Sequence, residues 1–402
     1  MQFQNVFIPY GGYWSTPFVK WQGSFAGLHP LTFAAEVTQR ALAERHIPPA
    51  AFEALYLGTT VPSPHAFYGA PWVAALIGAA GITGPTFSQA CATSARVIGS
   101  AAFEVETAPA AAVLCLTADR TSNAPHLSYP NPHNPGARPD TEDWVWDNFN
   151  CDPAIHLAMI ETAENVAREE EITTEEQHEV MLMRYAQYQA ALTDEAAFHR
   201  RYMVTPVEVR PSGKRIVATV KDDEGVFPTT AEGLARLKPV LPAGTVTFGA
   251  QTYPADGNAG MIVTSHDRAA ELSRAPQIAI QIVSFAQGRV KPGFMPEANV
   301  PAAQRALELA GLTVAEVKAI KTHNPFAVND IYFARTMGVR KEAMNNYGSS
   351  LIWGHPQGPT GMRLMIELIE ELVLRGGGYG LFTGCAAGDT AAAIVVKVGD
   401  QG

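Results

Sequence analysis

Two segments of this chain, 265 positions apart, share one pattern. Arg40 to Gly58 reads RALAERHIPPAAFEALYLG, and Arg305 to His323 reads RALELAGLTVAEVKAIKTH. Each segment has the spacing of an amphipathic helix, a short turn, a second short helical stretch and an apolar strand. We therefore expect the chain to contain two copies of one α/β unit.

The same offset places two reactive side chains at equivalent points of the two copies. Cys91, in SQACATS, falls opposite His355, in WGHPQGPTG, at an offset of 264. A thiolate attacks a carbonyl, and a nearby base makes the thiolate. The repeat therefore predicts a Cys–His active site on a pseudo-twofold axis. Cys91 follows an apolar strand and opens a helix, whose N-terminus is expected to lower the thiol pKa. The alternative for Cys91 is a buried, inert thiol.

The composition restricts the classes of partner. The 402 residues are 47% hydrophobic, which allows a large core and two or three domain-sized units. Only 17% are charged, as in a compact and oligomeric globular protein. The net charge of −10 disfavours nucleic acid and anionic membranes as main partners. The net charge does not exclude an anionic small-molecule ligand, because helix N-termini bind phosphates.

The cysteines indicate a reducing compartment. None of the four forms a CxxC pair, and no Cys/His cluster has zinc spacing, so we expect no metal site. No secretory signal opens the chain, and we expect a cytoplasmic protein. Phe67 to Ala95 carries no charge and is long enough to span a bilayer, but prolines and glycines interrupt it. We interpret it as a buried helix followed by a buried strand.

Strands and helices alternate in both ends of the chain, which predicts an α/β layered sheet in each. Residues 1–120 form the expected N-terminal half, 121–245 an inserted loop domain and 246–402 the C-terminal half. His126 to Asn150 is rich in aromatic residues and is either a substrate wall or an oligomer contact. Among the expected elements are strands at Asn5–Pro9, Ala54–Gly58 and Val246–Ala250 and helices at Leu31–Glu44, Asp256–Val263 and about Thr360 to Leu374.

Two further reactive residues end predicted strands. His323 lies in THNP, and Cys385 lies in the glycine-rich turn FTGCAAGD. Because α/β proteins place ligands at the carboxyl ends of their strands, both residues are candidates for the same site as Cys91 and His355.

Several motifs, in order, resemble the thiolase superfamily, whose members make or cleave 3-oxoacyl-CoA. The resemblance covers essentially the whole length. The motifs are the Cys91 turn, ETAENVA (Glu161 to Ala167), GLARLKPVLPAGTVTFG (Gly233 to Gly249), DGNAGMIV (Asp256 to Val263), HNPFA (His323 to Ala327), GHPQGPTGMR (Gly354 to Arg363) and the Cys385 turn. The resemblance implies the thiolase fold, in which two duplicated α/β halves form a five-layered α-β-α-β-α core with an inserted loop domain.

The resemblance also implies a role for each reactive residue. Cys91 would take the acyl group from CoA, and His355 would deprotonate it. Cys385 would move a proton to or from the α-carbon. His323 stands where many members have the Asn of an NEAFA motif. A subset that resembles sterol-carrier-type thiolases has His there, and His323 would orient a water or donate to the enolate oxygen. The N–H groups of Cys91 and Ala387 would form a second oxyanion hole.

Departures from the family pattern concern the substrate. Met159, Thr252, Phe326 and Gly354 would line the acyl and CoA pocket, and Thr252 replaces the usual serine of that region. The departures disfavour acetoacetyl-CoA as the main substrate and favour another acyl group, with aryl or branched acyl-CoA as candidates. The resemblance implies CoA as a substrate, no covalently bound cofactor, and a homodimer or dimer of dimers. Some similar thiolases work with a small zinc-ribbon/OB-fold accessory protein.

Two other function classes compete with an active thiolase. A ketosynthase-like condensing enzyme has the same fold but uses Cys-His-His, and Cys385 argues against it. A non-catalytic, acyl-CoA-binding subunit needs none of Cys91, His355 and Cys385. A thiolysis assay with free CoA separates the three classes.

Overall fold

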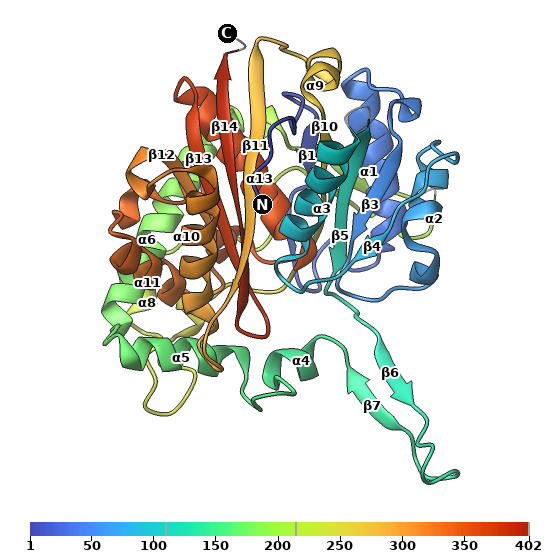
Figure 1. Cartoon of the computed structure of the whole chain (residues 1–402). Coiled ribbons are helices and arrows are strands. Elements are labelled where there is room, and N and C mark those ends of the chain that lie inside the picture. The colour runs from blue at the N-terminus through green and yellow to red at the C-terminus, as the bar shows by residue number, and fades with distance from the viewer. Residues whose placement is uncertain (109–110, 214, 401–402) are drawn as a thin grey trace.

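The computed structural model describes residues 1–108, 111–213 and 215–400. Its core is built from two sheets (Figure 1). The first has the strand order β1 (Tyr13–Ser15), β10 (Ala255–Thr264), β5 (Ala112–Arg120), β3 (Ala54–Gly58) and β4 (Thr86–Phe87), with β2 (Val19–Lys20) also paired to β10. The second has the order β11 (Ile278–Arg289), β14 (Thr390–Asp400), β13 (Gly378–Ala386) and β12 (Val317–His323).

The two sheets repeat one topology. In the first, β10 runs antiparallel to β5, and β5 runs parallel to β3. In the second, β14 runs antiparallel to β13, and β13 runs parallel to β12. The predicted duplication is therefore present in the strand pairing, with β3 and β12 as equivalent strands.

Helices complete the layers (Figure 1). Helices α3 (Thr93–Thr107) and α13 (Gly358–Leu374) contact each other and strands of both sheets, so they form the central layer. Helices α1 (Pro30–Glu44) and α2 (Gly69–Leu76) pack on the other face of the first sheet, and α10 (Asn299–Ala310) packs on the other face of the second. Buried apolar side chains fill the spaces between these layers.

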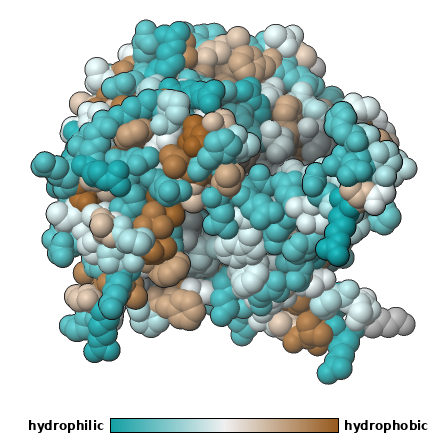
Figure 2. All heavy atoms as spheres, turned by 90° about the horizontal axis from the view of Figure 1, so that it is seen from below, coloured by the Kyte–Doolittle hydropathy of each residue, from teal (hydrophilic) through white to brown (hydrophobic). Residues whose placement is uncertain are grey.

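The inserted segment forms a hairpin and helices along one end of the core. The hairpin of β6 and β7 projects from the body, and α4 and α5 follow it (Figure 1). Figure 2 views this end and shows hydrophobic patches separated by hydrophilic surface. The remaining elements are β6 (His126–Tyr129), β7 (Asp140–Asp143), α4 (Trp146–Asn150), α5 (Met159–Glu169), α6 (Thr174–Ala191), α7 (Thr193–Ala196), β8 (Val207–Val209), β9 (Ala218–Val220), α8 (Ala231–Leu234), α9 (His266–Leu272), α11 (Ala327–Met337) and α12 (Ser350–Trp353).

Three expected elements differ in the structure. Asp256–Val263 is not a helix but part of strand β10, and it pairs with β5 of the first sheet. The second sheet therefore starts at β11 rather than near residue 246. Val246–Ala250 is not a strand, since Phe248–Ala250 forms a 3₁₀ turn. Asn5–Pro9 makes only isolated bridges, from Phe7 to Thr264 and to Gln281.

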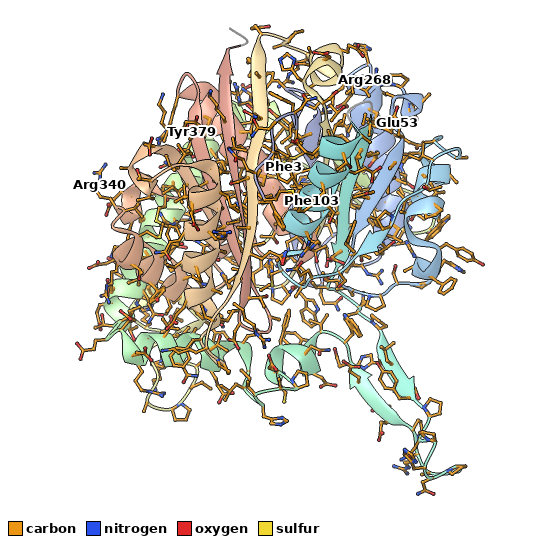
Figure 3. All side chains as sticks on the ribbon, in the orientation of Figure 1. Phe3, Glu53, Phe103, Arg268, Arg340 and Tyr379 are labelled. Atoms are coloured by element: carbon orange, nitrogen blue, oxygen red, sulfur yellow. The ribbon has the colours of Figure 1, made fainter. Side chains whose placement is uncertain are left out.

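The N-terminal segment nevertheless has a structural role. The bridges of Phe7 join β10 of the first sheet to β11 of the second. Nearby, the Phe3 ring meets the Phe103 ring of α3 edge to face, with centroids 5.4 Å apart (Figure 3). The segment therefore links the two halves and packs on the central helix layer.

The uncharged stretch Phe67 to Ala95 is only partly as expected. It contains helix α2, but β4 is a two-residue strand at the sheet edge, and Thr86 is exposed rather than buried. Among the described residues, every helix falls short of the length and apolar character that crossing a membrane needs.

Candidate active site

Cys91 lies in a tight turn between β4 and α3. Ala90 adopts a left-handed backbone with φ of +44°. The Thr93 hydroxyl closes the turn, because it accepts from the Gln89 N–H at 2.8 Å and donates to the Ala90 carbonyl at 2.7 Å. A strained turn that local hydrogen bonds hold in place is typical of functional positions. It keeps Cys91 at the surface end of the central helix, where the side chain is partly exposed.

His355 lies in the equivalent turn of the second half, between α12 and α13. Gly354 has φ of +89°, and a Cβ there would lie 2.8 Å from the Tyr253 ring, so only glycine fits. The His355 N–H donates to the Tyr253 carbonyl at 2.9 Å, and the His355 carbonyl accepts from Ala255 N–H at 3.3 Å. The segment leading into β10 therefore fixes the backbone of His355 from the other half of the molecule.

The two turns bring the thiol and the imidazole together. His355 Nε2 lies 3.1 Å from Cys91 Sγ, and His355 Nδ1 lies 2.6 Å from the Thr360 hydroxyl. A proton on Nδ1 that is donated to Thr360 leaves the Nε2 lone pair facing the thiol. The amide oxygen of Gln357, whose φ is +62°, accepts from Cys91 Sγ at 3.4 Å. This is the geometry of a nucleophile with its general base.

The surroundings of both members of the pair favour their neutral forms. Burial raises the pKa of the Cys91 thiol to about 12, although the N–H groups of Ala387 and of Cys91 itself oppose the shift. Burial also lowers the pKa of His355 to about 3. Our expectation that the thiol pKa would be lowered is therefore wrong, because desolvation outweighs the N–H groups that favour the thiolate. The N–H groups that oppose the shift are those expected to form the oxyanion hole.

His323 and Cys385 end neighbouring parallel strands. In the pairing of β12 with β13, His323 lies opposite Gly384. Asn329 Nδ2 donates to Cys385 Sγ at 3.3 Å. Burial lowers the pKa of His323 well below its usual value and raises the pKa of Cys385 well above its own. The His323 and His355 rings lie side by side, with centroids 4.1 Å apart.

A buried polar network orients His323. Its Nδ1 lies 2.9 Å from the Ser350 hydroxyl, which donates to Asn324 Oδ1 at 2.9 Å. Asn324 Nδ2 in turn donates to Asp330 at 2.8 Å, and Arg184 binds the same carboxylate oxygen at 2.8 Å. Since the Ser350 proton is committed to Asn324, Nδ1 of His323 is the protonated nitrogen. His323 Nε2 is buried and has no hydrogen-bond partner among the residues that the structure describes.

Asp119, at the carboxyl end of β5, ties the His355 turn to the first half. Its carboxylate accepts the Gly358 N–H at 2.8 Å, the Thr60 N–H at 2.7 Å and the Val61 N–H at 3.0 Å. Burial raises its pKa to about 6. Sequence reasoning missed Asp119, although its place at the end of a buried strand was a usable signal.

The expected substrate residues are not all in one place. Thr252 donates to the Ser350 carbonyl at 2.5 Å, and its N–H donates to the Pro325 carbonyl at 2.8 Å, so it lies against the His323 network. Phe326, which is buried, pairs with Gln251 in the same region. Met159 opens α5 and packs against the main core cluster from the inserted segment. The assignment of these residues to substrate binding stays a prediction.

The site opens to solvent on the side of the expected oxyanion hole. Ala387 is exposed and Cys91 is partly exposed, whereas His323, His355 and Cys385 are buried. Cys91 therefore lies between the exposed Ala387 and the buried side chains of the site.

Comparison with known proteins identifies the family and the fold. The thiolase N-terminal domain matches residues 13–267, and the thiolase C-terminal domain matches residues 276–398. The chain belongs to the thiolase family. The first matched domain ends after β10, in agreement with the pairing of that strand in the first sheet.

Relatives extend over most of this thiolase. Acetyl-CoA acetyltransferase of Escherichia coli (strain K12) is 30% identical over 79% of this chain and 79% of its own length. Mitochondrial 3-ketoacyl-CoA thiolase of Homo sapiens is 27% identical over 95% of this chain and 96% of its own. The crystal structure of Bacillus anthracis acetyl-CoA acetyltransferase superposes with a TM-score of 0.88 at 26% identity, and 99% of each chain is covered.

A second solved structure adds a ligand. Human mitochondrial 3-ketoacyl-CoA thiolase in complex with CoA superposes with a TM-score of 0.87 at 27% identity, and 98% of each chain is covered. The predicted thiolase fold is confirmed, and the chain is an acyltransferase of the thiolase family.

Proposed function

We propose that this thiolase cleaves a 3-oxoacyl-CoA with free CoA, or runs the reverse condensation, through an acyl group on Cys91. The observation that carries the proposal is the 3.1 Å contact of Cys91 Sγ with His355 Nε2, which brings together the two halves of the duplicated fold. Both relatives named above act on acyl groups carried by CoA, according to their names.

Acyl transfer to Cys91 follows from the neutral pair. His355 Nε2 takes the thiol proton as the sulfur attacks the carbonyl carbon of the 3-oxoacyl group or of an acyl-CoA. The tetrahedral oxygen then accepts from the N–H groups of Cys91 and Ala387, which already face the sulfur. When an acyl-CoA is the acyl donor, the departing CoA thiolate takes the proton of His355, which restores the neutral imidazole. When a 3-oxoacyl-CoA is cleaved, the departing α-carbon takes its proton from Cys385, and the resulting Cys385 thiolate recovers a proton from His355.

Carbon–carbon bond chemistry uses the second pair. Cys385 moves the proton to or from the α-carbon, and the enolate oxygen lies by His323. Because Nδ1 of His323 holds the proton at rest, Nε2 presents a lone pair. A water that donates one hydrogen to Nε2 and the other to the enolate oxygen fits this tautomer. Direct donation from Nε2 requires the Ser350 hydroxyl to turn from Asn324 to His323.

Two structural features favour a thiolase over the competing classes. Cys385 is fully buried, and Asn329 donates a hydrogen bond to its sulfur. The site therefore contains a second thiol, which a condensing enzyme of the Cys-His-His class does not need. The Cys91 turn and the His355 turn are both strained and hydrogen-bonded into place. A subunit that only binds acyl-CoA needs neither.

The acyl chain is a finer part of the proposal. We propose that acetoacetyl-CoA is not the main substrate and that an aryl or branched acyl group is preferred. This preference is supported by Thr252, which replaces the usual serine of the family and whose hydroxyl donates to the Ser350 carbonyl. A panel of short, long, branched and aryl 3-oxoacyl-CoA esters, assayed for thiolysis with free CoA, tests it. Highest kcat/KM on acetoacetyl-CoA would reject this preference.

The assembly is a further part of the proposal. We propose a cytoplasmic homodimer or dimer of dimers, with a zinc-ribbon/OB-fold protein as a candidate accessory subunit. The exposed edge strand β4 and the exposed rings of Phe67 and Tyr68 support an interface on that side. Sedimentation of the purified chain tests the oligomer, and the substrate panel repeated with the candidate accessory protein tests the partner.

A further inference from the structure

Cys91, His323 and His355 have the donor set of a metal site. The sulfur of Cys91 and one ring nitrogen from each histidine lie within 4.8 Å of one another, and no other such group occurs in the described part of the chain. Sequence spacing gave no sign of it, because the three residues come from segments far apart in the chain. We propose that these three residues bind Zn²⁺ and that the bound metal reversibly switches the enzyme off.

The hydrogen-bond network presents the correct atoms to a metal. His355 Nδ1 is engaged by the Thr360 hydroxyl at 2.6 Å, and His323 Nδ1 by the Ser350 hydroxyl at 2.9 Å. His323 Nε2 therefore carries a lone pair, and this atom is buried without a partner among the described residues. His355 Nε2 carries a lone pair when the proton on Nδ1 is donated to Thr360. Metal-binding histidines are oriented in the same way, with the second ring nitrogen held by a polar neighbour.

The spacing suits a tetrahedral ion. Zinc binds sulfur at about 2.3 Å and imidazole nitrogen at about 2.0 Å, so its ligand atoms lie about 3.3 to 3.6 Å apart. The distance from Cys91 Sγ to His355 Nε2 is 3.1 Å, and the other two separations are at most 4.8 Å, so the three side chains must adjust to reach the tetrahedral spacing. A thiolate with two imidazoles favours zinc over magnesium or calcium, and the fourth position stays open to water.

Binding and catalysis exclude each other. The metal replaces the Cys91 thiol proton, which leaves to solvent, and a zinc–sulfur bond forms. The same event occupies the lone pair of His355 that takes this proton during acylation. The inhibitory consequence rests on the proposed function, whereas metal binding itself does not.

The direct test measures binding without substrate. The experiment uses the full chain with the substitution Cys151→Ser, which removes the exposed thiol. Zn²⁺ is titrated into this protein in competition with a chromophoric chelator. Co²⁺ then serves as a spectroscopic probe, and a thiolate-to-cobalt charge-transfer band with tetrahedral d–d bands is expected for one equivalent. His323→Asn should weaken zinc binding by at least about 100-fold, and Ser350→Ala by about 10- to 100-fold. Cys385→Ser is the matched thiol control and should leave zinc affinity unchanged.

The second arm links the metal to Cys91. Zn²⁺ added before acyl-CoA should prevent acyl labelling of Cys91, a chelator should restore it, and enzyme acylated beforehand should lose the cobalt–thiolate band. Equal zinc affinity in the His323→Asn variant, or a cobalt spectrum without the thiolate band, overturns the metal site. Acyl labelling that fails in metal-free enzyme while zinc still binds overturns the proposed function instead.

Discussion

Cys91 Sγ and His355 Nε2 lie 3.1 Å apart although 264 positions of sequence separate them. The two residues lie in the turns that precede the central helices α3 and α13. Because of this contact, the reactivity of each residue depends on a residue from the other half of the fold.

Cys91 should be the acylated residue. Incubation of the enzyme with acyl-CoA should place the acyl mass on the Cys91 peptide, because among the described residues only this thiol has a side-chain base within hydrogen-bonding distance. Cys91→Ala should abolish thiolysis while leaving CoA binding and thermal stability in place. Peptide mass spectrometry checks the label, and a label on Cys115 or Cys151 instead contradicts the assignment.

Cys385 and His355 should fail at different steps. Cys385→Ala should still acylate Cys91 in a single turnover but should not make or break the carbon–carbon bond. His355→Ala should slow acylation itself by about 100-fold or more, because the thiol loses its base. Rapid-quench measurement of acyl-enzyme separates the two steps. Equal loss of acylation in both variants would contradict this division of roles.

His323→Ala should lower kcat by about 100- to 1000-fold, the usual cost of one oxyanion partner. Acylation of Cys91 should change little, because the enolate forms only in the carbon–carbon step. His323→Asn should recover part of the loss, since an amide also holds a water. Steady-state kinetics and thermal unfolding check both variants. If both lose stability and keep near-normal kcat, His323 is structural.

The alkylation of Cys91 should rise with pH and show no plateau near neutrality. Burial raises the thiol pKa to about 12, so the thiolate fraction increases about tenfold for each pH unit between about pH 7 and pH 10. Iodoacetamide labelling, corrected with Cys91→Ser, measures the profile. A plateau at neutral pH would instead show a standing thiolate–imidazolium pair.

Asp119→Asn should loosen the His355 turn. The carboxylate accepts the Gly358 N–H, and an amide cannot accept all of its present donors, so we expect a loss of about 1–3 kcal/mol of stability and a lower kcat. The Asp119 pKa is raised to about 6 in the folded state, so the folded chain holds this proton more tightly than the unfolded chain. The contribution of Asp119 to stability therefore falls as pH rises from about 4 to about 6.

Denaturant unfolding at several pH values checks the Asp119 prediction. The variant should lack the part of the pH dependence that Asp119 causes, and the exposed Asp267→Asn change serves as the control. A variant with the pH dependence and kcat of the parent protein would show that Asp119 does not hold the turn.

The repeat and the reactive residues could be predicted from the sequence, because both depend on local pattern. Strand β3 has the bounds expected for it, and helices α1 and α13 begin within two residues of the expected starts. Cys91 and His355 meet as the offset between the two copies predicted.

Strand β10 could not be predicted as a strand for a physical reason. Every residue of Ala255–Thr264 is buried, so the strand shows no alternation of apolar and polar residues. A wholly buried strand cannot be told from a buried helix by periodicity. Its two glycines, which usually weaken a strand, are needed for close packing, because a Cβ at Gly260 would collide with the Trp14 ring and one at Gly257 with the Phe18 ring.

The hydrogen-bond partners of the reactive residues also could not be predicted from the sequence. His323 is oriented by a network of Ser350, Asn324 and Asp330. The spacing of these residues along the sequence does not indicate that they are in contact. Thr360 and Gln357 lie within the motif that contains His355, but their roles depend on side-chain direction. The lone pair on His323 Nε2 follows from the network alone.

The matching turns at the starts of α3 and α13 bear on how such a chain evolves. A symmetric dimer of two identical halves must carry the same residue at both turns, because each residue on one copy is repeated on the other. One continuous chain is free of that constraint. One turn holds a sulfur nucleophile and the other a nitrogen base, so fusion of two copies converts a symmetric scaffold into an asymmetric catalyst without any change of fold.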